Sequence, residues 1–451
     1  MLHRSEIVRL RQEFERIADQ AFSFGKASGA DDIQISLQET ENWTVGARNG
    51  QPLQRNNSIR RNALISVMCK GIRASAATTD FSPDAVRRAL DAAIDIARYG
   101  ERDDLAAFSE ASDYCTDVRD LDLCHPWDIR YPDALALALE AEESARAVDP
   151  CIQQTEGASL WSSTGLSFLA SSRGFMGAIP WTQHGISCSP IAMRDGARQV
   201  EGWSSSERSV EQLETAVDVG RIAGERALGA IGGRQIPTGT YRVLIDAPTV
   251  TGLLGEFMRA VSGPLLRQGN SFLANTLGDA VFPEHVSISE DPFRLRGRSS
   301  APYDADGIAG TVRNVVDRGV LRGYFLDLYS ARSLKMAPTG NGGQTYNMEI
   351  FSALTAPSDT LQEMLKKLET GLLITHMAGS SDLTTGTFSR AVRGAWVKDG
   401  KIVHPVAGVT VASNLREMFS GLVAVGADTV ERGPFRTGSW LLADMSVGGS
   451  V

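Results

Sequence analysis

The six histidines of the chain are the first residues to test for metal chemistry, because imidazole is the commonest ligand of catalytic zinc. Zinc hydrolases of the HExxH type place two ligands on adjacent turns of one helix. No two histidines of this chain are close enough in sequence to share a helix face in that way. A site assembled from distant histidines stays open, but the spacing favours a structural role for each. The six are His3, His125, His184, His285, His376 and His404.

Other catalytic motifs are missing from the sequence as well. It contains no GxSxG of a serine hydrolase and neither phosphate-binding pattern, GxxxxGK[ST] or GxGxxG. The segment Gly340-Asn341-Gly342-Gly343 is rich in glycine, but no strand-to-helix context surrounds it. It is expected to be a flexible loop, with a loop that contacts a peptide or another ligand as the alternative.

The clearest strand-to-helix junction is LIDAPTVTGLLGEFMRAV, residues 244–261. Asp246 fits the N-cap, and Pro248 is tolerated in the first turn, where its missing N–H costs nothing. The apolar residues that follow recur at helical spacing, which predicts a helix with one face in the core. Gly252, Gly255 and Arg259 share another face. Since each internal glycine costs a helix roughly 1 kcal/mol relative to alanine, we expect a helix or strand to pack closely there, or else a ligand or a partner subunit.

Composition limits the function classes. A chain of 451 residues predicts two domains, and its 42% hydrophobic and 22% charged residues are typical of a globular protein. The net charge of −9 argues against a nucleic-acid binder. Apolar runs are too short to span a bilayer, which takes about 20 residues. The amphipathic start and the odd, scattered cysteines predict a cytoplasmic protein with reduced thiols. The cysteines are Cys69, Cys115, Cys124, Cys151 and Cys188.

In the first half, periodicity predicts a helix, an antiparallel meander over 33–79 with a hairpin at Asn49-Gly50, and a helix capped by Ser82. A helix at about 132–148 and further alternating strands follow. Ser209 and Gln212 resemble a capping box for a helix that ends near Ile231. The predicted fold is α+β, with an N-terminal domain, 1–231, whose antiparallel sheet carries helices on one face.

The second half, 232–451, is predicted to be a β-rich domain with short helices. Ser358 is expected to cap one helix and Asn414 another, and Asp399-Gly400 to form a hairpin turn. Glycines and a proline in GGRQIPTGT, residues 232–240, place the domain boundary there.

Several segments resemble the TldD/PmbA family, and specifically its PmbA (TldE) branch. The most specific is GTFSRAVRGAWVKDGKIVHPVAGVTVASNLREMFSGLVAVGAD, residues 386–428. LYSARSLKMAPTGNGG (328–343), GQTYNMEI (343–350) and RTGSWLLADMSVGG (436–449) match as well. In the first half, ASAATTDFSPDAVRRALDAAIDIARY and LDLCHPWDI fit the same branch, so the resemblance runs nearly end to end.

The resemblance implies a two-chain zinc peptidase that acts on unfolded peptides in the bacterial cytoplasm, with roles in the maturation of peptide precursors and in antitoxin removal. The TldD-type subunit carries the metal on an HExxxH helix, and the PmbA-type subunit lacks it. When that helix is aligned through its GLxGxF continuation, the first His falls on Asp246, the Glu on Ala247 and the second His on Thr251. The resemblance therefore implies no catalytic residue and no metal in this chain, and zinc in its partner. The chain departs from the family in two places: Ser389-Arg390-Ala391 stands where the family usually reads SRG, and Arg393 follows in a stretch that is usually small.

The leading interpretation is a non-catalytic subunit that completes the cleft of a heterodimeric metallopeptidase. An unfolded substrate would add as a β-strand, contacting the loops 338–347 and 379–393. The residues predicted to contact substrate are Asn341, Asn347, Ser389 and Arg390. Two alternatives stay open: a stand-alone peptide-binding, chaperone-like protein, and an independent Ser/Thr hydrolase, which the missing elbow disfavours.

Overall fold

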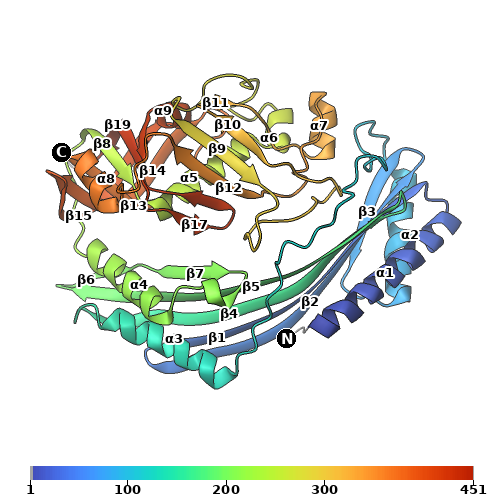
Figure 1. The fold of residues 1–451 in the computed structure, drawn as a ribbon, viewed down its shortest axis with the longest axis horizontal. Coiled ribbons are helices and arrows are strands. Elements are labelled where there is room, and N and C mark those ends of the chain that lie inside the picture. Colours follow the sequence, from blue (N-terminus) through green and yellow to red (C-terminus); the bar gives the residue numbers. More distant parts are fainter. Residues whose placement is uncertain (1–3, 450–451) are drawn as a thin grey trace.

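The computed structural model describes residues 4–449, which form three antiparallel or mixed β-sheets with helices around them (Figure 1). The N-terminal sheet has the order β3-β2-β1-β4-β5-β6, with β7 also paired to β5. Its strands are β1 (Asp32–Arg48), β2 (Gln51–Cys69), β3 (Ile72–Thr78), β4 (Ile152–Ser171), β5 (Phe175–Arg194), β6 (Ala197–Val200) and β7 (Trp203–Glu207).

Turn chemistry sets the register of this sheet. Asn49 and Gly50 both have positive φ, 52° and 79°, the geometry of a type I′ turn, and they join β1 to β2 as predicted. Side chains alternate between faces with a period of two. Ile33, Ile35 and Leu37 of β1 are buried beneath helices, whereas Gln34, Ser36 and Gln38 point to the opposite face.

The helices of the N-terminal region cover one face of the sheet. α1 (Arg4–Ala27) and α2 (Pro83–Tyr99) pack on one half, and α3 (Tyr131–Arg146) and α4 (Ala216–Ala230) on the other. Ser82 caps α2 as predicted, since its hydroxyl accepts the N–H of Ala85. The uncovered face turns toward the C-terminal region.

The C-terminal region contains two more sheets. One has the order β11-β10-β9-β12-β18-β17 and the other β15-β14-β13-β8-β19-β16. Their strands are β8 (Gly239–Ile245), β9 (Val286–Asp291), β10 (Arg313–Asp317), β11 (Val320–Leu321), β12 (Asn347–Ser352), β13 (Gly371–Ala378), β14 (Thr387–Lys398), β15 (Lys401–Asn414), β16 (Leu422–Val425), β17 (Val430–Arg432), β18 (Phe435–Thr437) and β19 (Trp440–Gly448). The predicted turn Asp399-Gly400, with φ of 51° and 71°, joins β14 to β15.

Helix α5 (Ala247–Ala260) lies in the largest core of the molecule. Val250, Leu253, Leu254 and Phe257 are buried there, which confirms the apolar face that the sequence predicted. Shorter helices surround the two sheets. They are α6 (Gly263–Arg267), α7 (Leu328–Leu334), α8 (Leu361–Leu368) and α9 (Leu415–Ser420), the last capped by Asn414 as predicted.

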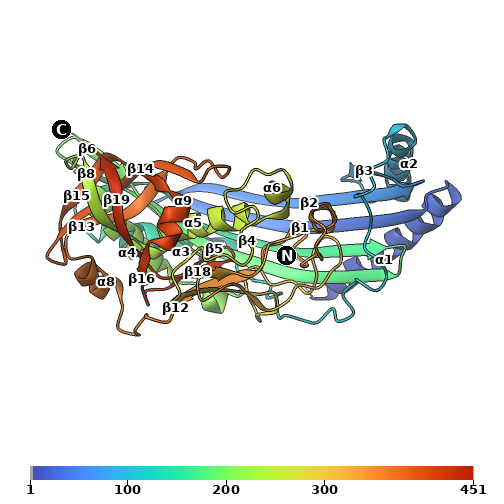
Figure 2. The same ribbon diagram turned by 90° about the horizontal axis from the view of Figure 1, so that it is seen from above.

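Arginines hold the two regions together. The guanidinium of Arg208, whose pKa burial lowers to about 10, donates to the backbone oxygen of Arg298 at 2.6 Å. Arg298 in turn pairs with Glu207, and Arg226 pairs with Asp246 at 2.9 Å. Seen from above, the long strands run past the C-terminal region, which covers one part of their length (Figure 2).

Two predicted helix starts are wrong. Ser209 caps only a 3-10 turn, Val210–Gln212, and α4 begins after Thr215, whose hydroxyl accepts the N–H of Asp218 at 3.0 Å. In the C-terminal region α8 begins after Thr360 rather than Ser358. In both places two polar residues compete for one helix end, and local pattern alone does not rank them.

The α+β class and the sheet with helices on one face are confirmed. The domain limits, 1–231 and 232–451, stay a prediction. Within residues 4–449 no disulfide forms, and no helix is long and apolar enough to cross a membrane.

Candidate functional site

The first turn of α5 is the candidate site that the sequence singled out. Asp246 is only 4% exposed, and one carboxylate oxygen accepts the N–H of Thr249 at 3.0 Å. The other oxygen is 2.9 Å from a guanidinium nitrogen of Arg226, which also donates to the carbonyl oxygen of Thr375. Both oxygens of Asp246 are therefore engaged, one as a helix cap and one in a buried ion pair.

The neighbouring positions contribute little to a metal site. Ala247 has no donor atom, and the hydroxyl of Thr251 donates to the backbone oxygen of Pro248 at 2.7 Å. Zinc in proteins needs three or four N, S or O ligands around one point. Asp246, Ala247 and Thr251 together offer one carboxylate, already paired with a guanidinium, so these residues do not fit a zinc ion.

The glycine face of α5 differs from its prediction. A β-carbon added at Gly252 would meet no atom of the described residues within 4 Å, and at Gly255 only Phe435, at 3.8 Å. Gly252 and Arg259 are exposed. The expectation that a helix or strand packs closely on this face is wrong at Gly252, which borders open space, whereas Phe435 of β18 does lie against Gly255.

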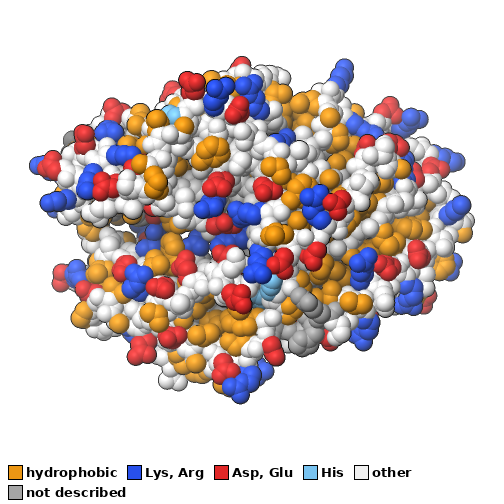
Figure 3. All heavy atoms as spheres, viewed as in Figure 1, with side chains coloured by type: hydrophobic (Ala, Val, Ile, Leu, Met, Phe, Trp, Pro, Cys, Tyr) orange, Lys and Arg blue, Asp and Glu red, His pale blue; other side chains and the backbone are white. Residues whose placement is uncertain are grey.

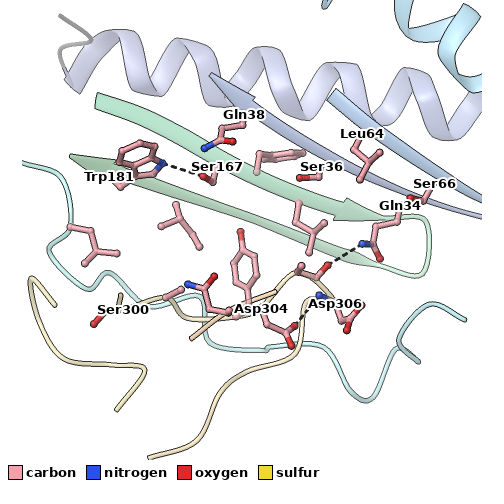
Figure 4. Close-up of a pocket in the computed structure, with 18 of the residues that line it drawn as sticks. Gln34, Ser36, Gln38, Leu64, Ser66, Ser167, Trp181, Ser300, Asp304 and Asp306 are labelled. Carbon is pink, nitrogen blue, oxygen red and sulfur yellow. Dashed lines mark hydrogen bonds between the residues drawn. The ribbon is translucent and has the colours of Figure 1, made fainter. Parts of the chain in front are cut away.

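A cavity lies away from α5, between the uncovered face of the N-terminal sheet and the loop 300–306 (Figure 4). We call this space, of about 530 Å³, the central cavity. Its sheet side includes apolar side chains and the guanidinium of Arg73. It also carries neutral polar groups, which are amides, hydroxyls and one indole. They are Gln34, Ser36, Gln38, Ser66, Ser167, Trp181 and Gln183. Such a lining offers hydrogen bonds to a neutral, extended main chain.

The C-terminal side of the central cavity contains the buried carboxyl group of Asp304 and the half-buried one of Asp306. Burial, together with the charge of Asp306, raises the pKa of Asp304 to about 7. Asp304 accepts the N–H groups of Asp306, Ile308 and Gly342 at 2.9, 2.9 and 2.6 Å. Burial also raises the pKa of Asp306. The hydroxyl of Tyr303 is buried without a hydrogen-bond partner among residues 4–449.

The predicted contact residues Asn341 and Asn347 are both buried. The amide of Asn341 donates to Glu290 at 2.7 Å and its oxygen accepts from Thr339 and Arg313. The amide of Asn347 likewise donates within the chain, to a backbone oxygen and to a serine hydroxyl. Their substrate-contact role stays a prediction, and the geometry gives both amides an internal one. Loop 338–347 does reach the central cavity, through Gln344.

The other two predicted residues lie on β14. Ser389 is exposed, whereas Arg390 forms a largely buried ion pair with Glu256 of α5. One oxygen of Glu256 and the Nε of Arg390 have no partner among the described residues. The structure thus brings loop 379–393 to α5 through Arg390, and loop 338–347 to the same helix, where Thr345 donates to the sulfur of Met258. A peptide contact by Ser389 or Arg390 stays a prediction.

The histidines are dispersed, as their spacing predicted. His184 is buried between the hydroxyl of Ser162 and the backbone oxygen of His125. His285 lies between Ser352 and the backbone oxygen of Leu422. Residues 4–449 contain no group of three His, Cys, Asp or Glu side chains arranged to hold a metal, and His3 lies outside the described residues.

Sequence reasoning missed the residues that line the central cavity. Alternation in β1, β2, β4 and β5 identifies two faces but does not say whether the polar one meets water or another part of the chain. One signal was available, since a water-facing strand is usually charged, and Gln34, Ser36 and Gln38 are all neutral.

Comparison with known proteins gives consistent results. The family model described as the PmbA/TldA metallopeptidase central domain matches residues 124–231, and that of the C-terminal domain matches 238–449. Metalloprotease PmbA of Escherichia coli O157:H7 is 32% identical over 94% of this chain and 93% of its own length. A Metalloprotease TldD homolog of Buchnera aphidicola is 27% identical over 45% of this chain and 44% of its own.

Two solved structures establish the likeness of fold. A proposed modulator of DNA gyrase from Bacteroides thetaiotaomicron superposes with a TM-score of 0.91 over the whole of both chains, at 23% identity. TldE of Thermococcus kodakarensis has a TM-score of 0.82 over 96% of this chain and 100% of its own, at 15% identity.

Proposed function

Because the chain belongs to the PmbA/TldD metallopeptidase family, we propose that it is the metal-less subunit of a two-chain peptidase. A TldD-like partner with an HExxxH helix would hold the zinc ion and the general base. This chain would complete the space in which an unfolded peptide is cleaved. Maturation of peptide precursors in the cytoplasm is the proposed setting.

The observation that carries the proposal is the chemistry at the start of α5. The resemblance aligns the metal helix of TldD-type chains with α5, and here Asp246 is engaged by Arg226 and by the helix end. Ala247 cannot act as a base, and Thr251 donates its hydroxyl hydrogen within the turn. A guanidinium beside the first ligand position opposes the binding of a cation by electrostatic repulsion.

The residues of this chain contribute binding surface under the proposal. The amides and hydroxyls of the central cavity suit the N–H and C=O groups of an extended peptide, which are present whatever its sequence. The open glycine face of α5 offers close approach to a ligand or a partner chain. Loops 338–347 and 379–393 stay the proposed substrate contacts.

The test uses the purified full-length chain, a TldD-like chain, and their mixture. We expect the mixture to form a complex, to contain zinc in the TldD-like chain, and to cleave an unfolded peptide. The control is a TldD-like chain with Gln in place of the Glu of HExxxH, which should assemble without cleaving. Metal-dependent cleavage by this chain alone would contradict the proposal. Absence of both complex and cleavage, with peptide binding retained, would favour the stand-alone peptide-binding protein.

A further inference from the structure

A second hollow lies between the two regions, at the start of α5. It has a volume of about 320 Å³, at the lower end of the range for ligand pockets. Strands β5 and β7 and helix α4 form one side, and the first turn of α5 and β17 form the other. We call it the arginine pocket, and its polar lining is Ser187, Ser189, Trp203, Ser204, Arg226 and Arg432. Figure 3 shows Lys or Arg side chains gathered in the opening between the two regions.

Arg432 is the unusual member of this lining. Its guanidinium lies over the ring of Trp203, 4.3 Å from the centroid, and Trp203 is held in turn by a 2.6 Å hydrogen bond from its indole to Glu214. Within residues 4–449 the side chain of Arg432 forms no hydrogen bond and no ion pair. Its fixed fork of N–H donors is therefore stacked and positioned but has no acceptor.

Two other guanidiniums and two carboxylates act on the charge of Arg432, and neither carboxylate is its hydrogen-bond partner within the described residues. Burial is the largest cause that lowers the pKa of Arg432; Arg298 and Arg226 add to it, while Glu214 and Glu207 oppose it. Arg226 already pairs with Asp246 and with a backbone oxygen. The pocket thus presents one guanidinium that has no acceptor among the described residues, and its single charge matches a monoanion such as a carboxylate.

We propose that the arginine pocket binds a carboxylate of the substrate peptide, with Arg432 as its ion-pair partner and the hydroxyls of Ser189 and Ser204 as further donors. The inference rests on the proposed function for the nature of the ligand as a peptide. Two sources share this chemistry, the carboxylate of the peptide C-terminus and an Asp or Glu side chain. Either would fix the position of a peptide next to the helix that corresponds to the partner's metal helix.

The test measures binding to the full-length chain by fluorescence anisotropy with four labelled Gly/Ser/Ala hexapeptides. One has a free C-terminus and one an amidated C-terminus. The other two are amidated and contain an internal Glu or Gln. We expect a free carboxylate to bind about tenfold or more tightly than its neutral counterpart, as is typical of charged hydrogen bonds. In Arg432→Gln this ratio should fall to about twofold or less.

The matched control is Arg436→Gln. Arg436 lies on the adjacent strand β18, is 45% exposed and faces Glu349 at 3.7 Å, so the ratio should not change. Discrimination by the free C-terminus alone, or by the internal Glu as well, supports the inference and tells the two sources apart. Equal affinity for all four peptides in the wild-type chain would overturn it whether or not the variant folds.

Two further outcomes would also overturn the inference. One is discrimination that persists in Arg432→Gln. The other is a variant that loses assembly with the TldD-like chain and binds peptides normally, since Arg432 would then pair with a partner carboxylate. Failure of the proposed function is separate, because it is measured by complex formation and zinc-dependent cleavage in the mixture. If the two chains together cleave peptides but this chain does not bind carboxylates preferentially, only the inference about the arginine pocket is rejected.

Discussion

The central cavity and the arginine pocket lie between the same two regions but differ in the charged groups that line them, since, among residues 4–449, only the central cavity has carboxylates in its lining. Amides, hydroxyls and apolar side chains from β1, β2, β4 and β5 line the central cavity, opposite the buried Asp304 and the half-buried Asp306. Arg73 and Arg208 also belong to this lining, so both signs of charge are present. The arginine pocket has two guanidiniums around Trp203. The first can hold main chain without selecting a sequence, and the second can hold a negative charge.

The difference shows how one surface between two regions can have two roles. In the central cavity, burial raises the pKa of Asp304 and Asp306, so these two carboxylates take up protons at a higher pH than exposed aspartates do. Beside the arginine pocket, both oxygens of Asp246 are engaged, and the guanidinium of Arg432 has no acceptor among the described residues. At the positions that the proposed function aligns with the metal ligands of a TldD-like partner, this chain has an internal ion pair, and Arg226 of that pair lines the pocket.

The largest expected effect is on stability and comes from Arg226→Ala, which removes the ion pair beside the arginine pocket. Asp246 would lose its ion pair while staying buried, which costs roughly 3 kcal/mol or more in unfolding free energy. This cost is that of a buried ion pair, and it applies here because the side chains of Arg226 and Asp246 are only 22% and 6% exposed. Denaturant unfolding followed by circular dichroism measures the loss.

The matched control is Arg221→Ala on the same helix. Arg221 is 48% exposed and pairs with Glu225 one turn away, so its removal should change stability by about 0.5 kcal/mol or less. If the two variants unfold at the same denaturant concentration, the ion pair between Arg226 and Asp246 does not stabilise the folded chain.

The central cavity is tested through pH. The pKa of Asp304 is raised from 3.8 to about 7, so the folded chain keeps a proton that the unfolded chain loses. The stabilisation from this proton is complete below pH 4 and is lost as the pH rises through 7, at most about 1.4 kcal/mol per pH unit. Asp304→Asn should therefore flatten the decline in stability between pH 4 and pH 7.

The slope rather than the level is the readout, because Asn also places an amide N–H near the N–H of Gly342, which Asp304 accepts in the wild type. Asp95→Asn, at a residue whose side chain is 62% exposed on α2, serves as the control and should keep the wild-type slope. Equal slopes in Asp304→Asn and the wild type would mean that Asp304 does not titrate in this range.

Local signals in the sequence predicted much of the fold. Asn49-Gly50 and Asp399-Gly400 determine their turns through backbone preference alone, and the apolar spacing in α5 reports its buried face directly. The sites depended on contacts between distant segments. Arg226 meets Asp246 across a connection of 20 residues, and Arg432 meets Trp203 across most of the C-terminal region. No periodicity carries that information.

The glycines of α5 show the limit most clearly. Two glycines in a helix raise the same expectation whether a neighbour packs on them or not, since the cost in propensity is the same. The structure has open space at Gly252, one turn after Pro248 on the face that begins at the arginine pocket.

The smallest expected effect is that of Gly252→Ala, which tests the glycine face of α5 beside the arginine pocket. A β-carbon there meets no described atom within 4 Å, so alanine should stabilise the chain by about 0.5–1 kcal/mol through helix propensity. Gly220→Ala in α4 is the control; its β-carbon would collide with the backbone oxygen of Ala141, so that variant should be destabilised. If the face docks against a TldD-like chain, Gly252→Ala should weaken assembly while it raises the unfolding temperature. A gain in stability with unchanged assembly would place the partner elsewhere and leave the glycine face to the substrate.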